Sequence, residues 1–316
     1  MTDATAVQQG APPLPGTRRR SGRTPAGSGG DGKVAVLFLA PALVGFLLFY
    51  VYPTLRGIYF SFTSYNLLVA PQGVGLANYR ALVHDPLFWN ALKVTLYFCA
   101  LNIVSQTVLA LALAAIMFRL TRSVAIRVML LVPWLVPNVT VGLLWLWLLD
   151  ADIGLVNHVI DAFGGTKQGF FVSPTLAMPS VALVNAWAYT GYTALLLYAG
   201  MLQIPRHLYE AATLDGAGEI RMFFRLTLPL MRPILALVLI VSIIGSFQIF
   251  DTVAVAGQHG GPVNVTRVIY YYIYQLAFTQ FRMGYASAVA MTLMVVLGAF
   301  VFVQMRLMRA STSDLA

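Results

Sequence analysis

The sequence has little charge and almost no cysteine. Only 10% of its 316 residues are Asp, Glu, Lys or Arg, against roughly a quarter in a typical soluble domain. Its single cysteine, Cys99, lies inside an apolar run, which excludes a disulfide framework and a cysteine-rich metal site. Hydrophobic residues make up 59% of the chain, and its mean hydropathy is +0.77. These values predict a membrane protein.

Acidic residues are absent from the interior of the apolar runs. All 11 Asp and Glu lie in predicted tails, loops or span ends, where Asp150 and Asp251 are terminal at best. An ion-coupled secondary transporter usually needs an ionisable group among its spans, so this absence argues against that class, which we keep as the alternative function. The four histidines are scattered among predicted loops without a paired ligand spacing such as HExxH. We therefore expect no catalytic residues, no metal site and no enzyme.

Six apolar runs are long enough to cross about 30 Å of hydrocarbon, which takes roughly 20 helical residues each. They lie near residues 34–52, 92–118, 124–149, 176–203, 234–250 and 286–308. With the N-terminus inside, fourteen of the 20 Lys and Arg residues fall on the inner side. The positive-inside rule then predicts an all-α, multi-pass protein of the cytoplasmic membrane with both termini in the cytoplasm.

Three segments follow from this division. Residues 1–33 are rich in Pro, Gly, Ser and Thr and carry five basic residues, so they predict a disordered basic cytoplasmic tail. Residues 34–309 form the six-span domain, and residues 310–316 form a short C-terminal tail.

The third span contains two prolines. Pro133 and Pro137 each remove an intrahelical hydrogen bond, so this helix should kink near the middle of the membrane. Trp134 and Asn138 lie beside them. Kinked helices often surround a transport cavity, although helix packing alone also accounts for prolines.

The fourth and fifth spans carry further polar and aromatic residues. Asn185, Tyr189 and Tyr192 follow one another at i, i+4 and i+7, which places them on one stripe of a helix. Gln248 and Asp251 lie near the outer end of the fifth span. Aromatic rings that pack on C–H groups, together with amides that bond hydroxyls, suit a neutral polyol. For each of these residues taken alone, hydrogen bonding between helices is the better explanation.

Residues 206–229 are the longest polar interruption in the C-terminal half, and we call them the elbow. Pro205 should start a first short helix, and Gly216 should end it as a left-handed cap. A second helix is expected over about 219–227, and Pro229 should mark the entry into the next span.

The spacing in the elbow resembles the EAA loop of permease subunits from binding-protein-dependent ABC importers. The corresponding positions, with the neighbouring Asp215, are Glu210, Ala211, Ala212, Asp215, Gly216, Leu226, Leu228 and Pro229. The family usually has Ile where this chain has Leu226. The resemblance extends from Ala40 to Arg306 and is greatest to permeases of the maltose and glycerol-3-phosphate type.

The resemblance implies a type I ABC importer permease fold that imports a sugar or sugar-like solute. It also implies that the elbow docks into a cleft on a cytoplasmic ATPase. The expected partners are a second homologous permease, two ATPase subunits and an extracytoplasmic solute-binding protein, and no nucleic acid. The ATPase would bind ATP and Mg, so this chain should need no cofactor.

Aromatic residues also mark the predicted outer loops. Residues 75–79 and 85–89 predict an interfacial helix that lies on the bilayer. Four tyrosines between residues 270 and 274 predict an aromatic belt at the membrane surface.

Overall fold

The computed structural model describes residues 31–120, 123–256 and 261–309. The predicted tail at 310–316 and all but the last three residues of the tail at 1–33 therefore lie outside the described residues. The chain forms two compact units, Met1–Thr54 and Leu55–Ala316. Among the described residues both units are helical and contain no strand.

The described part of the first unit is a continuous apolar helix. It comprises α1 (Asp31–Phe46), a π-helical turn (Leu47–Val51) and the beginning of α2 (Tyr52–Ser61). The apolar segment Val36–Ser61 has 26 residues, so it is longer than the span predicted at 34–52.

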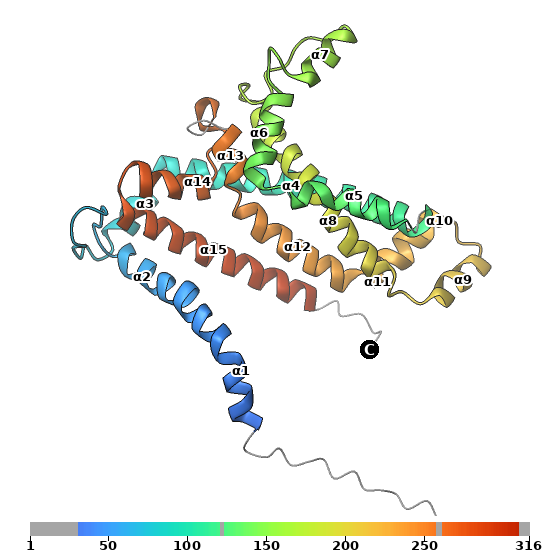
Figure 1. Ribbon diagram of the computed structural model, residues 1–316, viewed down its shortest axis with the longest axis horizontal. Coiled ribbons are helices and arrows are strands. Elements are labelled where there is room, and N and C mark those ends of the chain that lie inside the picture. The colour runs from blue at the N-terminus through green and yellow to red at the C-terminus, as the bar shows by residue number, and fades with distance from the viewer. Residues whose placement is uncertain (1–30, 121–122, 257–260, 310–316) are drawn as a thin grey trace, which may run out of the picture. The chain divides into compact units, whose positions relative to one another are not determined.

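The second unit contains the remaining helices. In chain order they are α3 (Ala77–Val83), α4 (Pro86–Leu120), α5 (Val124–Leu135), α6 (Asn138–Leu148), α7 (Leu155–Ala162), α8 (Ala177–Met201), α9 (Arg206–Leu214), α10 (Glu219–Met222), α11 (Leu228–Leu230), α12 (Arg232–Phe247), α13 (Asp251–Ala256), α14 (Ile269–Tyr274) and α15 (Met283–Arg309) (Figure 1). Two π turns (Phe223–Thr227 and Gln275–Thr279) and a 3-10 turn (Pro262–Asn264) connect some of them.

Fewer helices than the predicted six are long and apolar enough to count as membrane spans. Within the described residues, four helices are long and apolar enough to cross a membrane, or five if α5 and α6 together count as one span. The span predicted at 176–203 does form a helix, α8, but it falls outside this set. Its polar stripe lowers its hydropathy, and most of its residues are buried against other helices rather than exposed. The count of six is thus not confirmed.

Helix α4 runs through the core of the second unit. It packs against α8, α12 and α14. Near its start Phe88 is buried with side chains of α14 and α15, and at mid-length Phe98 is buried with side chains of α8 and α13. Near its end Met117 is buried with side chains of α8 and α12. Because lipid is as apolar as these side chains, close packing is what favours the association.

Helices α5 and α8 approach each other closely at Gly191. A Cβ atom at this position would lie 1.8 Å from the backbone oxygen of Leu130 in α5. Only glycine therefore fits here, in the manner of the small residues that let membrane helices touch.

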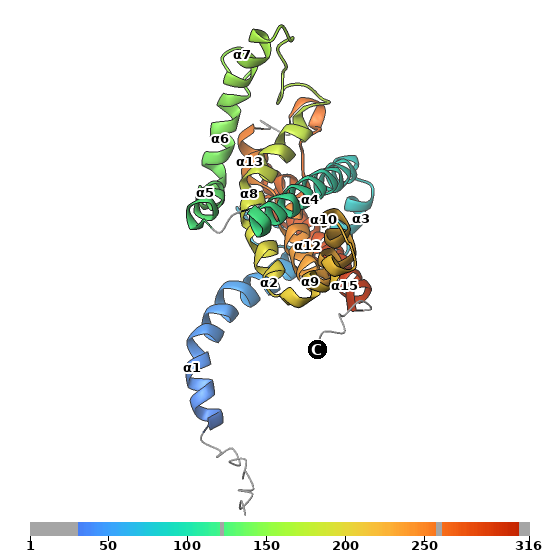
Figure 2. The same ribbon diagram turned by 90° about the vertical axis from the view of Figure 1, so that its right-hand side faces the viewer.

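The third predicted span is broken at its prolines. Helices α5 and α6 are bent by 92° relative to each other, and Figure 1 shows α6 turning away from α5. Pro133 lies inside α5, while Val136 is extended (ψ 135°), as the residue before a proline should be, and Pro137 precedes α6. The predicted kink is confirmed, but it separates two helices instead of bending one span over 124–149. Helices α5, α6 and α7 line one side of the second unit (Figure 2).

A π turn lets the second elbow helix continue past Pro229. The sequence predicts that this helix ends near Thr227, whereas the helical run extends to Leu230. In a regular helix the N–H of residue 229 would donate to the carbonyl of Arg225, but proline has no N–H and its ring clashes with that carbonyl. Here Arg225 lies in the wider π turn Phe223–Thr227, which lets the helix continue. The first unit repeats the arrangement, with a π turn two residues before a proline.

Candidate functional site

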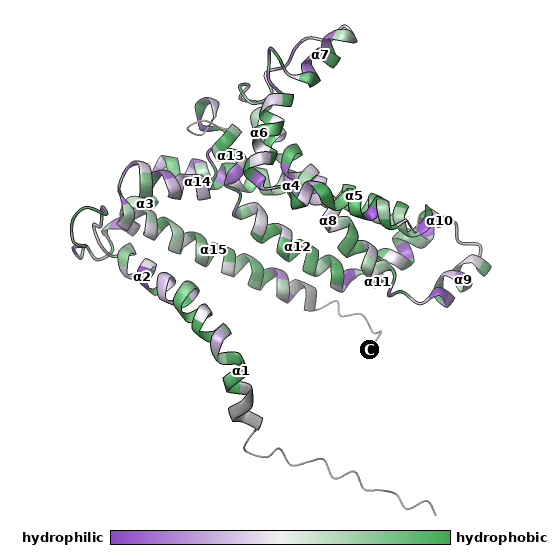
Figure 3. Ribbon diagram, viewed as in Figure 1, coloured by the Kyte–Doolittle hydropathy of each residue, from purple (hydrophilic) through white to green (hydrophobic). Residues whose placement is uncertain are grey.

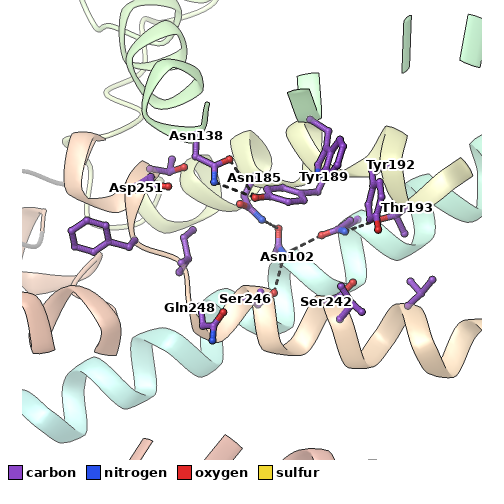
Figure 4. Close-up of a pocket in the computed structure, with 18 of the residues that line it drawn as sticks. Asn102, Asn138, Asn185, Tyr189, Tyr192, Thr193, Ser242, Ser246, Gln248 and Asp251 are labelled. Atoms are coloured by element: carbon purple, nitrogen blue, oxygen red, sulfur yellow. Dashed lines mark hydrogen bonds between the residues drawn. The ribbon is translucent and has the colours of Figure 1, made fainter. Parts of the chain in front are cut away.

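A cavity of about 300 Å³ lies among α4, α5, α6, α8, α12 and the start of α13 (Figure 4). All seven side chains that the sequence predicts along a substrate pathway line it, although they span more than 110 positions of the chain. They are Trp134, Asn138, Asn185, Tyr189, Tyr192, Gln248 and Asp251. The structure therefore brings the predicted residues together, and their contact with a substrate stays a prediction.

Asn102 of α4 joins three helices at the cavity wall. Its Nδ2 donates to Ser246 Oγ on α12 at 3.0 Å, and its Oδ1 accepts a hydrogen bond from Asn185 Nδ2 on α8 at 2.9 Å (Figure 4). One turn further along α4, Gln106 Nε2 donates to Thr193 Oγ1 on α8 at 2.8 Å. Both α4 amides are almost fully buried, so these bonds satisfy groups that would otherwise be costly inside the membrane.

The sequence reasoning missed these α4 residues as part of the site. Asn102 and Gln106 are spaced i, i+4 in an otherwise apolar run, the same signal that identifies the polar stripe of α8. Ser242 and Ser246 repeat the spacing on α12, and both line the cavity. A search for polar pairs at helical spacing in every apolar run would have found Asn102, Gln106 and Ser246.

Two pairs connect the bend between α5 and α6 to α8. Asn138, the first residue of α6, lies with its amide 3.1 Å from the hydroxyl oxygen of Tyr189 (Figure 4). The rings of Trp134 and Tyr192 stack with centroids 4.6 Å apart and planes inclined by 11°. The polar stripe thus does both things that the sequence left open, since its members bond other helices and also line the cavity.

The cavity wall carries little charge. Asp251 is the one charged side chain among the described residues that line it, and its carboxylate makes no hydrogen bond or ion pair with the part of the chain that the structure describes. The other polar groups are amides and hydroxyls, beside two tyrosine rings and one tryptophan ring. Such a wall can exchange hydrogen bonds with hydroxyl groups and pack rings on C–H surfaces. Within the described residues no three His, Cys, Asp or Glu side chains are grouped to hold a metal.

The first elbow helix, α9, ends in the left-handed cap that the sequence predicts. Gly216 has φ +73°. Its N–H donates to Thr213 O at 3.0 Å, and the N–H of Ala217 donates to Ala212 O at 2.9 Å. These are the two hydrogen bonds of a Schellman motif, which satisfies carbonyls that the end of a helix leaves unpaired.

The elbow exposes both charged and apolar side chains. Three large apolar residues stand out toward solvent, namely Leu214, Ile220 and Phe224. Of the predicted coupling residues, the exposed ones are Glu210, Ala211, Asp215 and Gly216, and the half-buried ones are Ala212, Leu226, Leu228 and Pro229. Figure 3 shows hydrophilic residues gathered on α9 and α10, in contrast to the hydrophobic α12 and α15.

Comparison with known families identifies the chain. The family described as "Binding-protein-dependent transport system inner membrane component" matches residues 106–311, about two thirds of its length. The chain belongs to this family. The permease is 34% identical over 283 residues to the sulfoquinovosyl glycerol transport system permease protein SmoG of Agrobacterium fabrum, covering 89% of this chain and 92% of that one. It is also 34% identical over 274 residues to the sn-glycerol-3-phosphate transport system permease protein UgpA of Salmonella typhimurium, covering 85% and 92%.

A solved structure has the same fold. It is a chain of a bacterial ABC transporter involved in the import of the acidic polysaccharide alginate. It matches the permease with a TM-score of 0.78 at 24% identity, over 90% of this chain and 98% of that one.

These matches confirm several predictions. The permease has the predicted family, an all-α permease fold, and a place in the inner membrane as a transport subunit rather than an enzyme. The family's description also favours an ABC permease over the ion-coupled alternative. The side on which the termini lie stays a prediction.

Residues of the predicted outer loops serve the packing of the permease itself. Asp85 accepts hydrogen bonds from the hydroxyl groups of Tyr272 (2.5 Å) and Tyr285 (2.6 Å). Burial would raise the pKa of Asp85, but these bonds, with two from backbone amides, hold it below its usual value. The predicted aromatic belt is therefore wrong for Tyr271 and Tyr272, which are buried. Consecutive residues of α14 point about 100° apart, so four tyrosines cannot share one face.

Proposed function

We propose that this permease carries a sugar or sugar-like solute across the cytoplasmic membrane through the cavity among α4, α8 and α12. The observation that carries the proposal is the cavity wall itself. Amides, hydroxyls and aromatic rings from helices far apart in sequence face one space of about 300 Å³, at the lower end of ordinary ligand pockets.

The chemistry of the wall favours a hydroxylated solute. Asn185 and Tyr189 can exchange their present hydrogen bonds for bonds to sugar hydroxyls. This exchange limits the free energy that is lost when the hydrogen bonds between the helices break. The stacked rings of Trp134 and Tyr192 offer a flat surface for the C–H face of a sugar ring. The relatives named for sulfoquinovosyl glycerol and sn-glycerol-3-phosphate, and the transporter of the polysaccharide alginate, support the same class of solute.

The energy for transport would come from partner chains. We place two ATPase subunits on the cytoplasmic side, with the elbow of this chain docked on one of them, and ATP and Mg bound by the ATPase alone. The exposed apolar residues Leu214, Ile220 and Phe224 give the elbow a surface for such a partner. A second homologous permease would complete the pathway, and an extracytoplasmic binding protein would deliver the solute. Both termini would be cytoplasmic, as the distribution of basic residues favours.

The cavity can be tested by cysteine accessibility in the assembled transporter. Cysteines at Asn185, Tyr189 and Tyr192, introduced one at a time, should react with a water-soluble thiol reagent, and a transported sugar should slow the reaction. A cysteine at Val184, which is fully buried on the same helix, is the matched control and should stay inert. The native Cys99 is also buried, so the background should be low.

Two results would contradict the proposal. If the three positions react no faster than the Val184 control, the stripe serves only to bind helices together. If the purified chain accumulates sugar in vesicles that contain no ATPase, the assignment of the energy source is wrong.

A further inference from the structure

The end of α4 contacts the second helix of the elbow, the run from α10 to α11, which we call the second arm. The guanidinium group of Arg119, in the last turn of α4, forms an ion pair with the carboxylate of Glu219, the first residue of α10. A second guanidinium nitrogen donates to the backbone oxygen of Glu219 at 3.2 Å. Each charge also lies at the helix end that favours its sign, because a basic group suits a C-terminus and an acidic group an N-terminus.

The preceding residue of α4, Phe118, contacts the first helix of the elbow, α9, which we call the first arm. The ring of Phe118 packs on Tyr209 of α9 with centroids 5.7 Å apart. The hydroxyl oxygen of Tyr209 lies 3.0 Å from Thr227 Oγ1, in the π turn of the second arm. Two consecutive residues of α4 thus contact both helices of the elbow, and a hydrogen bond closes the arms on each other.

The same helix forms part of the cavity wall. Asn102 and Gln106 bond to α8 and α12 there, and Gln106 is thirteen residues from Arg119, which is about 20 Å along a helix. Beyond Pro86, its first residue, α4 contains neither proline nor glycine. It can therefore transmit a displacement as one rigid body, unlike the neighbouring α5 and α6, which are bent by 92°.

We propose that Arg119 is a positioning residue that transmits movement of the elbow through α4 to the cavity wall. This inference rests on the proposed function, since it requires an ATPase that moves the elbow. When the elbow turns, the ion pair and the Phe118–Tyr209 contact draw the end of α4 with it. Asn102 and Gln106 then shift against α8 and α12, which changes the hydrogen bonds that face the solute.

The test is charge removal and charge exchange in the assembled transporter, with sugar uptake per ATP hydrolysed as the readout. Arg119→Gln and Glu219→Gln should each lower this ratio by about twofold to fivefold, the range expected for a partly exposed ion pair. The single reversals, Arg119→Glu and Glu219→Arg, should lower it further, and the double exchange should restore at least half of the loss. Lys167→Gln, at an exposed cation outside the elbow that has no ion pair among the described residues, is the control and should couple normally.

The outcomes separate this role from a merely structural one. Loss of the ATPase from all the Arg119 and Glu219 variants on purification would mean that the pair only keeps the elbow folded, and would overturn the inference. So would a normal coupling ratio in Arg119→Gln, or a double exchange no better than the single reversals. If the unaltered transporter shows no ATP-dependent uptake at all, the proposed function itself fails. This result differs from a failure of the present inference, which is judged by comparing variants with an unaltered transporter that does take up sugar.

Discussion

Gly216 is the position of the elbow where a side chain should do the most harm for a purely conformational reason. A Cβ atom at Gly216 meets nothing within 4 Å, so a β-carbon there creates no clash with the rest of the chain. Its cost arises from φ +73°, which disfavours L-residues by roughly 1–2 kcal/mol and valine, as a β-branched residue, more than most. This energy corresponds to about a 5- to 30-fold shift of the local folding equilibrium toward an open elbow.

The neighbouring Gly218 supplies the matched control. It also has open space around its Cβ position, but its φ of −68° and ψ of 163° suit any residue. We expect Gly216→Val to speed hydrogen exchange of the amides of residues 212–217 by about 5- to 30-fold and to reduce both ATPase co-purification and uptake. Gly218→Val should change neither, and Gly216→Asn should fall between them, because asparagine tolerates the left-handed region. Equal behaviour of Gly216→Val and Gly218→Val would refute the reasoning.

Two further predictions concern the packing of the helices. Gly191→Ala should lower the thermal stability of the purified protein by an amount equivalent to about 1–3 kcal/mol, since its methyl group would meet the backbone oxygen of Leu130. Gly298→Ala on α15, where a Cβ meets nothing within 4 Å, should instead leave the stability unchanged or raise it by up to about 1 kcal/mol, because alanine favours a helix over glycine. Asp85→Asn should cost about 1–3 kcal/mol at pH 7, because its two tyrosine partners would lose a charged acceptor. Since the folded-state pKa of Asp85 is lowered, its contribution is intact above the usual value and is lost as the pH falls through the lowered pKa. The thermal unfolding curves of the unaltered protein and of Asp85→Asn should therefore converge only below about pH 4. A difference in unfolding temperature that stays constant down to about pH 2 would contradict this account.

Features that depend on a few adjacent residues could be predicted from the sequence. The start of α9 after Pro205, the left-handed Gly216 and a bend at Pro133 and Pro137 all follow from backbone chemistry that acts over one turn. The polar stripe of α8 was also visible, because the spacing of three residues is enough to define a helix face.

Features that depend on distant partners could not be predicted. Asn102 bonds Ser246 across 144 positions and Asn185 across 83, and no local signal pairs these residues. The burial of Tyr272 likewise depends on Asp85, which is 187 positions away. The π turn before Pro229 escaped prediction for another reason: the pattern identifies a proline as a stop, whereas a wider turn just before it lets the helix continue.

The polar stripe of α8 has a consequence for how the protein is made. Asn185, Tyr189 and Tyr192 place polar groups in the middle of α8, and such groups cost free energy in lipid unless they are hydrogen-bonded. Its hydrogen-bonding partners Asn102 and Asn138 belong to α4 and α6, which leave the ribosome earlier. The order of synthesis therefore supplies the hydrogen-bonding partners of the stripe before α8 itself is made.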